Sequence, residues 1–269
     1  MILSVFFVFV VFVFGLCVGS FLNVLIYRLP RGLGFVKGRS FCPHCKRKIN
    51  WFDNVPLLSF VMLAGRCRFC HSPITWRYPI VELVTGLITL LILNFKFQIF
   101  NQFLNLNFQI VFDLVCYLIL AWALIVIFFI DLEHQIIPDE VVYPIVALFL
   151  LKSVLFSFNT GYLILNTFLS AIGASLFLLL IYLVTKGKGM GFGDVKLAFL
   201  MGLVLGFPKI VVAFYLAFLT GAFVGIILIL VRKAKFGQKI AFGPFLALST
   251  IISVLWGEKI LSLALKVLL

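Results

Sequence analysis

The chain has 269 residues, of which 64% are hydrophobic and only 12% are charged. Soluble domains are roughly 45–50% apolar and about 25% charged, so a single water-exposed globule is excluded and lipid must cover much of the apolar surface. The formal net charge of +13 would favour nucleic acid in a soluble protein. In a membrane protein such charge sets topology, and we expect the lipid bilayer and no nucleic acid as partner.

Eight apolar segments approach the length of about 20 residues that a membrane-spanning helix needs. The sixth is short, and the first lacks the basic start and the cleavage site of a removed signal peptide, so we expect it to be retained. The sequence therefore predicts an all-α polytopic membrane protein of about eight transmembrane helices, at residues 1–27, 79–97, 110–131, 139–157, 163–185, 193–206, 208–231 and 241–266.

One long polar segment, residues 28–78, separates the first two predicted spans. With the later connections near residues 186–196 and 232–239, it places 17 of the 22 lysines and arginines on one side of the membrane. Basic residues concentrate in the cytoplasmic loops of membrane proteins. We therefore expect a small cytoplasmic loop domain at 28–78 and both termini outside the cytoplasm.

Four cysteines in this loop form two CxxC pairs, Cys42 with Cys45 and Cys67 with Cys70. Each pair can place two thiolates on one tetrahedral ion, and two such turns close a four-cysteine zinc site. Two disulfides are the alternative, but stable disulfides are rare in a reducing cytosol. Four cysteine ligands leave no open position, so we expect structural zinc; His44 and His71 fit better as exposed loop residues.

Two aspartates stand at the same predicted membrane face. Asp131 ends the third span and Asp194 begins the sixth, within Gly191-Phe192-Gly193-Asp194. Ionisable groups in or beside the hydrocarbon layer are costly and usually functional, and a carboxylate pair can divide acid and base roles. The glycines would let a substrate strand approach. Alternatively, the acids only mark topology or pair with Lys188 and Lys196.

The other polar residues indicate less specific roles. Asn23 in the first span is either an interhelical hydrogen-bond partner or part of a polar site. Glu82 fits an ion pair with a nearby arginine. Asp139 and Glu140 fit the N-terminus of the fourth helix, and Asp113 and Glu258 have no obvious partner.

Nearly the whole chain resembles the type IV prepilin leader peptidases, membrane enzymes of pilus, type II secretion and competence systems. The resemblance rests on motifs in the same order: Gly19-Ser20-Phe21-Leu22-Asn23-Val24, Tyr27-Arg28-Leu29-Pro30, the two CxxC pairs, Asn54-Val55-Pro56-Leu57-Leu58-Ser59, Arg77-Tyr78-Pro79, Asp131 with Ile137-Pro138-Asp139, Gly191-Phe192-Gly193-Asp194-Val195-Lys196 and Phe242-Gly243-Pro244-Phe245.

This resemblance implies that Asp131 and Asp194 are the catalytic pair of an aspartic endopeptidase of the bacterial inner membrane. It implies cleavage of the basic leader of a prepilin or pseudopilin precursor, followed by N-methylation of the new N-terminal residue with S-adenosylmethionine. The four-cysteine loop accompanies methylation in that family. We therefore associate residues 1–97 with methyl transfer and residues 110–269 with peptidase activity, without assigning residues to the methyl donor. A peptidase without methylation, or a zinc-knuckle transporter or assembly factor, are the alternatives.

Overall fold

A computed structural model describes residues 2–34, 38–100, 108–156, 161–187, 189–232 and 240–268. Within those ranges the regular structure is helical, apart from two isolated bridges in the cysteine loop, so the all-α prediction is confirmed. Five basic residues used to predict the orientation, Lys37, Lys188, Lys233, Lys235 and Lys239, lie outside the described residues.

Each of the eight predicted apolar segments forms a helix. Six of these helices are long and apolar enough to cross a membrane in the part of the chain that is described. The other two are α5, which carries three charged residues, and α7, which has only 14 residues. The helices are α1 (Ile2–Arg28), α3 (Arg77–Phe100), α4 (Phe108–His134), α5 (Asp139–Phe156), α6 (Gly161–Val184), α7 (Phe192–Leu205), α8 (Lys209–Leu230) and α9 (Gly243–Leu268).

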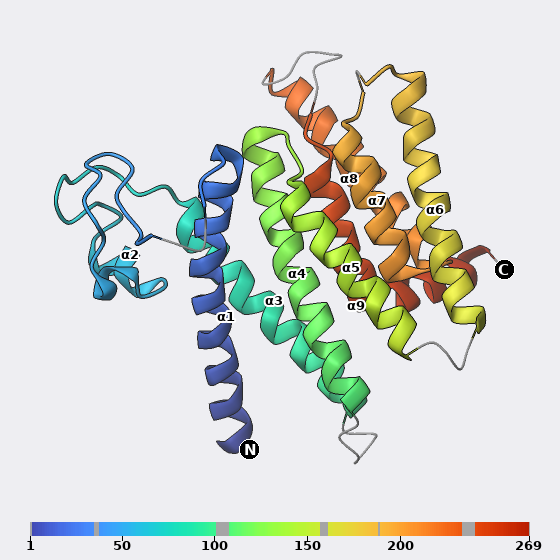
Figure 1. Ribbon diagram of the computed structural model, residues 1–269, viewed down its shortest axis with the longest axis horizontal. Coiled ribbons are helices and arrows are strands. Elements are labelled where there is room, and N and C mark those ends of the chain that lie inside the picture. Colours follow the sequence, from blue (N-terminus) through green and yellow to red (C-terminus); the bar gives the residue numbers. More distant parts are fainter. Residues whose placement is uncertain are drawn as a thin grey trace. The chain divides into compact units, whose positions relative to one another are not determined.

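The chain forms two compact units, Met1–Ile110 and Val111–Leu269. In the first, α1 and α3 pack closely side by side (Figure 1). Glycines make this approach possible, because a Cβ at Gly15 would lie 2.8 Å from the Cα of Gly86, and one at Gly19 would lie 2.7 Å from the Cα of Glu82. Small residues at a helix contact are the usual means of association in membranes.

The polar loop of the first unit is built from short elements: η1 (Leu29–Arg31), η2 (Trp51–Asn54) and α2 (Leu58–Met62). Arg28, at the end of α1, donates to the carbonyl oxygens of Gly34 and Gly38 at 3.0 and 3.2 Å. A segment too short for its own hydrophobic core therefore depends on polar anchors of this kind.

The second unit has one hydrophobic core to which α4, α5, α6, α7, α8 and α9 all contribute. The short helix α7 lies deep in it, and its Gly202 would place a Cβ only 2.5 Å from the Cα of Ala171 in α6. The ends of α4, α6 and α8 and the starts of α5, α7 and α9 gather at the upper end of this unit in Figure 1. Residues far apart in the sequence thereby meet at one end of the bundle.

Candidate active site and metal centre

Asp131 lies three residues before the end of α4 and is only 5% exposed. Its Oδ2 accepts a hydrogen bond of 2.9 Å from the backbone N–H of Gly243, at the start of α9. A negative charge near the C-terminal end of a helix is unfavourable. The position therefore costs stability, which is common for residues that serve function.

Asp194 lies in the first turn of α7 and is also 5% exposed. Its Oδ2 accepts a hydrogen bond of 3.0 Å from the backbone N–H of Gly191, as the acidic N3 residue of a capping box does. The carboxylate thus has a local structural role, and that bond also fixes its orientation.

Ile137 packs against two glycines, one beside each aspartate. It follows α4 in the short loop before α5, and its side chain fills the space beside two glycines. A Cβ at Gly193 would lie 2.9 Å from the Cβ of Ile137, and a Cβ at Gly243 would lie 3.2 Å from its Cδ1. Ile137 therefore requires glycine at position 193, and the approach of a substrate strand to these glycines stays a prediction.

Gly243, which bonds Asp131, and Gly193, which directly precedes Asp194, both lie against the side chain of Ile137. The structure thus brings the two predicted residues together. The alternative pairing with Lys196 does not occur, because its Nζ instead donates to both carboxylate oxygens of Asp139, at 2.7 and 2.8 Å. Lys188, the other cation considered, lies outside the described residues.

The ion pair between Lys196 and Asp139 was not predicted, because Asp139 was expected only to stabilise the N-terminus of its helix. The pair joins the N-terminal parts of α5 and α7. It thereby holds the loop containing Ile137 next to Gly193 and Asp194. Neighbouring Glu133 and His134 are exposed.

The sulfur atoms of Cys42, Cys45, Cys67 and Cys70 all lie within 4.8 Å of one another. A tetrahedral ion with Zn–S bonds of about 2.3 Å separates its ligands by roughly 3.8 Å, and the Sγ atoms of Cys42 and Cys70 are 3.8 Å apart. The donor set therefore fits zinc. The six cysteines are free of disulfides, and the two histidines beside the pairs are exposed.

The two CxxC turns have the same backbone structure. The N–H of the first cysteine donates to the carbonyl five residues later, from Cys42 to Arg47 and from Cys67 to Ser72, both at 2.9 Å. The fourth residue after each first cysteine, Lys46 or His71, has a positive φ. This repeated turn aims two sulfurs of each pair at one point, as a metal knuckle requires.

Hydrogen bonds to sulfur favour the thiolate forms that bind metal. The hydroxyl of Ser72 is 3.1 Å from the Sγ of Cys70, and this contact lowers the pKa of the Cys70 thiol to about 6. Ser72 was not among the predicted site residues. Its position two residues after the last cysteine of a CxxC pair was the sequence feature that could have indicated a role at the metal site.

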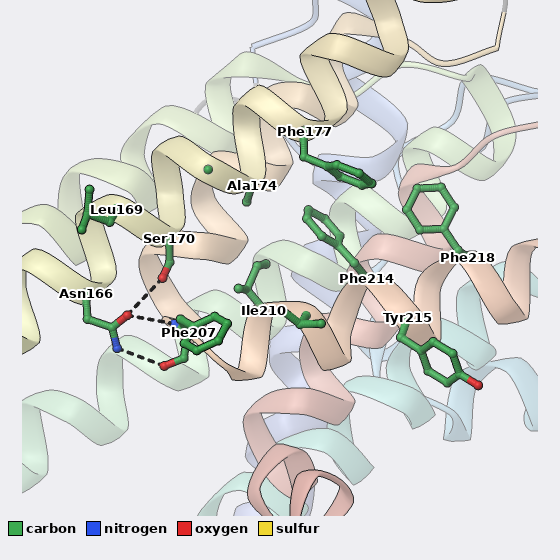
Figure 2. A pocket seen from close by; sticks show the side chains of 12 residues that line it. Asn166, Leu169, Ser170, Ala174, Phe177, Phe207, Ile210, Phe214, Tyr215 and Phe218 are labelled. Atoms are coloured by element: carbon green, nitrogen blue, oxygen red, sulfur yellow. Dashed lines mark hydrogen bonds between the residues drawn. The ribbon is translucent and has the colours of Figure 1, made fainter. Parts of the chain in front are cut away.

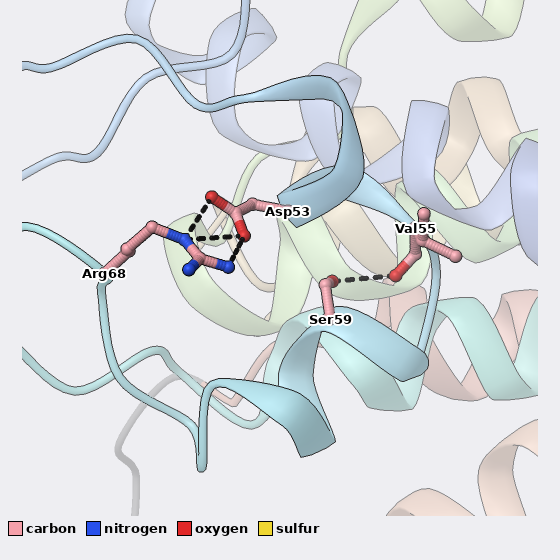
Figure 3. Close-up of polar contacts among 4 residues, drawn as sticks. All are labelled: Asp53, Val55, Ser59 and Arg68. Atoms are coloured by element: carbon pink, nitrogen blue, oxygen red, sulfur yellow. Dashed lines mark hydrogen bonds and ion pairs between the residues drawn. The ribbon is translucent and has the colours of Figure 1, made fainter.

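Two side-chain contacts hold the CxxC turns in place. Figure 3 shows Arg68, inside the second CxxC, held by three contacts of 2.6–3.0 Å to the carboxylate of Asp53, while the hydroxyl of Ser59 caps Val55 nearby. The guanidinium of Arg47, in the first turn, lies 5.2 Å from the ring centre of Phe69, in the second. The first contact joins the second turn to η2, and the second joins the two turns to each other.

Asn23 and Glu82 form the polar part of the contact between α1 and α3. The Nδ2 of Asn23 donates to the Tyr78 carbonyl at 3.1 Å, which is the interhelical role considered for it. The Oε2 of Glu82, 8% exposed, accepts from the N–H of Leu57 at 2.9 Å. Glu82 therefore anchors the loop backbone, where the sequence had suggested an arginine partner.

The two units define a polytopic membrane protein with a buried carboxylate pair in one and a four-cysteine metal centre in the other. Residues 13–96 match the model of the bacterial peptidase A24 N-terminal domain, and residues 118–226 match that of the type IV leader peptidase family. With the whole-chain relatives described next, these matches show that the chain belongs to the type IV leader peptidase family.

Relatives named prepilin leader peptidase/N-methyltransferase align over almost the whole chain. The protein of Aeromonas hydrophila is 35% identical, covering 93% of this chain and 91% of its own length. That of Legionella pneumophila is 33% identical over 94% and 92% of the two chains, and that of Pseudomonas aeruginosa is 34% identical over 91% and 89%. No solved structure matches.

Proposed function

We propose that this protein cleaves the basic leader peptide of prepilin-like precursors and then methylates the new N-terminal amine. The observation that carries the proposal is that two buried aspartates from different helices, Asp131 and Asp194, lie beside Gly243 and Gly193, two glycines that both pack against Ile137. Relatives that align along nearly the full length carry the names of both activities. The long apolar helices make it a membrane protein.

The carboxylate pair supplies what peptide hydrolysis needs. Carboxylates held close together share one proton, because two adjacent negative charges repel each other. The ionised member takes a proton from water as the oxygen attacks the scissile carbonyl carbon, and the protonated member gives its proton to the departing amide nitrogen. The N–H groups of Gly243 and Gly191 each engage one oxygen, which leaves the other oxygen of each carboxylate for water and substrate.

Methyl transfer requires a donor site, and the first unit contains a cavity of suitable size. Its volume is about 670 Å³, within the range of about 300–1,000 Å³ for small-molecule sites. The rings of Phe60 and Trp76, with centres 5.0 Å apart, form an aromatic wall, and Arg66 and Thr75 supply polar groups. An adenine ring stacks on such a wall and a carboxylate pairs with arginine, so this cavity fits S-adenosylmethionine.

When bound, S-adenosylmethionine supplies the methyl group that the new N-terminal amine attacks. The cavity residues Phe60, Trp76 and Arg66 would hold the donor. Zinc on the four cysteines would stabilise the loop that forms the cavity, because Gly65 and Ile74 on its wall flank the second CxxC turn and share a hydrogen bond of 2.7 Å. We propose residues 1–97 as the methylating part and residues 110–269 as the peptidase part.

The distribution of basic residues supports an inner-membrane location with the cysteine loop in the cytoplasm. Precursor leaders would then meet the enzyme on the side where they are made. The direct test incubates the enzyme in lipid vesicles with a prepilin and S-adenosylmethionine and measures the mass of the product's N-terminus. A shortened, methylated product supports both activities, a shortened unmethylated product removes methylation, and an unprocessed precursor refutes the proposal.

A further inference from the structure

An apolar groove lies on the second unit between α6 and α8 (Figure 2). Its volume is about 680 Å³, and Phe177, Ile210, Phe214 and Phe218 contribute to its wall. Since α6 and α8 both contain candidate membrane spans, the surface of the groove faces the lipid phase. Its occupant must therefore be apolar.

The polar groups at one end of the groove are already paired. The side chain of Asn166 exchanges two hydrogen bonds with the backbone of Phe207, of 3.0 and 3.2 Å, and accepts a third from Ser170 at 3.3 Å. Figure 2 shows these contacts beside the aromatic side chains. The groove thus presents an apolar surface to a ligand, because the amide group of Asn166 is already bonded within the chain.

Two chains of contacts connect the other end of the groove to the carboxylate pair. The ring of Phe218 lies 5.0 Å from that of Phe242, and the next residue, Gly243, donates to Asp131. On the other wall Ser175, next to groove residue Ala174, bonds the carbonyl of Val195 at 3.3 Å. Val195 directly follows Asp194 in α7.

The length of the groove suits a helix. The α6 residues that line it run from Asn166 to Phe177, which at 1.5 Å per residue is about 16 Å, or three helical turns. Gly173 and Ala174 form part of this wall, and small residues allow a second helix to approach closely in a membrane.

We propose that this groove binds the apolar helical segment that follows the scissile bond of the precursor. The inference rests on the proposed peptidase function and adds the place where the substrate is held. The helix lies between α6 and α8, and its first residues reach Asp131 and Asp194. An acyl chain of a lipid is the competing occupant, and the experiment distinguishes the two.

The first measurement is photo-crosslinking from p-benzoylphenylalanine at Tyr215 or at Phe223 of α8. The two aromatic residues are equally exposed, at 67% and 66%, but only Tyr215 lines the groove. We expect the Tyr215 probe to capture an uncleaved prepilin bound to the Asp194→Asn enzyme and the Phe223 probe to capture little. Equal capture from both positions, or capture of lipid without precursor, would overturn the inference.

The second measurement fills the groove with Gly173→Phe. A Cβ at Gly173 meets no atom within 4 Å, so the change blocks the groove without disturbing the core. We expect KM for a full precursor to rise by roughly tenfold or more, because the benzyl group takes the place of the docked helix. Cleavage of a short peptide that spans the scissile bond but lacks the apolar segment should be unchanged.

Ile172→Phe is the matched control, since Ile172 is an exposed neighbour on α6 that does not line the groove. An unchanged KM for the precursor in the Gly173→Phe enzyme overturns the proposal that the groove binds the precursor, while leaving the proposed peptidase function intact. A wild-type enzyme that cleaves neither substrate refutes the proposed function itself, and the groove proposal with it.

Discussion

Replacing Gly243 by alanine tests the geometry of the carboxylate pair most sharply. The new Cβ would lie 2.6 Å from Oδ2 and 3.0 Å from Cγ of Asp131. Ordinary contacts begin near 3.4 Å, so the carboxylate has to move by about 0.8 Å or more, and a misplacement of about 1 Å at a reacting group can cost roughly 100-fold in rate. We expect kcat/KM for precursor cleavage to fall by about this factor.

Gly191→Ala is the control within the same site. Its Cβ would lie 3.6 Å from Oδ2 of Asp194, which is an ordinary contact, and the backbone φ of −82° suits alanine. We expect near-normal cleavage. The assay measures kcat/KM for a prepilin in lipid vesicles, together with the unfolding temperature of each variant. Normal cleavage by Gly243→Ala, or an equal loss in Gly191→Ala with normal folding, would refute the reasoning.

Three further predictions concern the surroundings of the two sites. Removing the ion pair with Lys196→Met or Asp139→Asn should lower cleavage by roughly five- to tenfold, and the double variant should lose no more than either single one, because each change breaks the same contact; additive losses would contradict this. In the metal-free chain, the Cys70 thiol with its pKa lowered to about 6 is a thiolate at neutral pH, so alkylation at pH 7 should be fast and should slow in Ser72→Ala. Zinc content measured by elemental analysis should fall on acidification below the pKa of the metal-free thiol, because protons then compete for the sulfurs; a zinc content that strong acid leaves unchanged would be inconsistent with the account. Trp76→Ala should weaken binding of S-adenosylmethionine, measured by calorimetry, while leaving leader cleavage unchanged; normal donor affinity would remove the cavity from the proposal.

The helices and both clusters of candidate site residues could be predicted from the sequence. Runs of apolar residues define membrane helices because lipid leaves few alternatives for the backbone. The CxxC spacing places two sulfurs at one turn by local geometry alone. Asp131 and Asp194 were paired because topology puts the end of one helix and the start of another at the same face.

Contacts between distant polar residues could not be predicted in the same way. The pairs of Lys196 with Asp139 and of Lys152 with Asp113, the latter 3.1 Å apart, depend on which helices become neighbours. Hydrophobic periodicity does not specify that choice when most helix faces are apolar. The contact of Ile137 with Gly193 was not predicted for the same reason, since it is a tertiary contact.

The most direct test of the central claim compares prepilin cleavage by the wild-type enzyme with cleavage by Asp131→Asn and Asp194→Asn. Both changes keep the size of the side chain and remove its acid–base function, and thermal unfolding verifies that the variants fold. The account predicts that the wild-type enzyme removes the leader and that each folded variant leaves the precursor intact. Normal leader removal by either variant would contradict it.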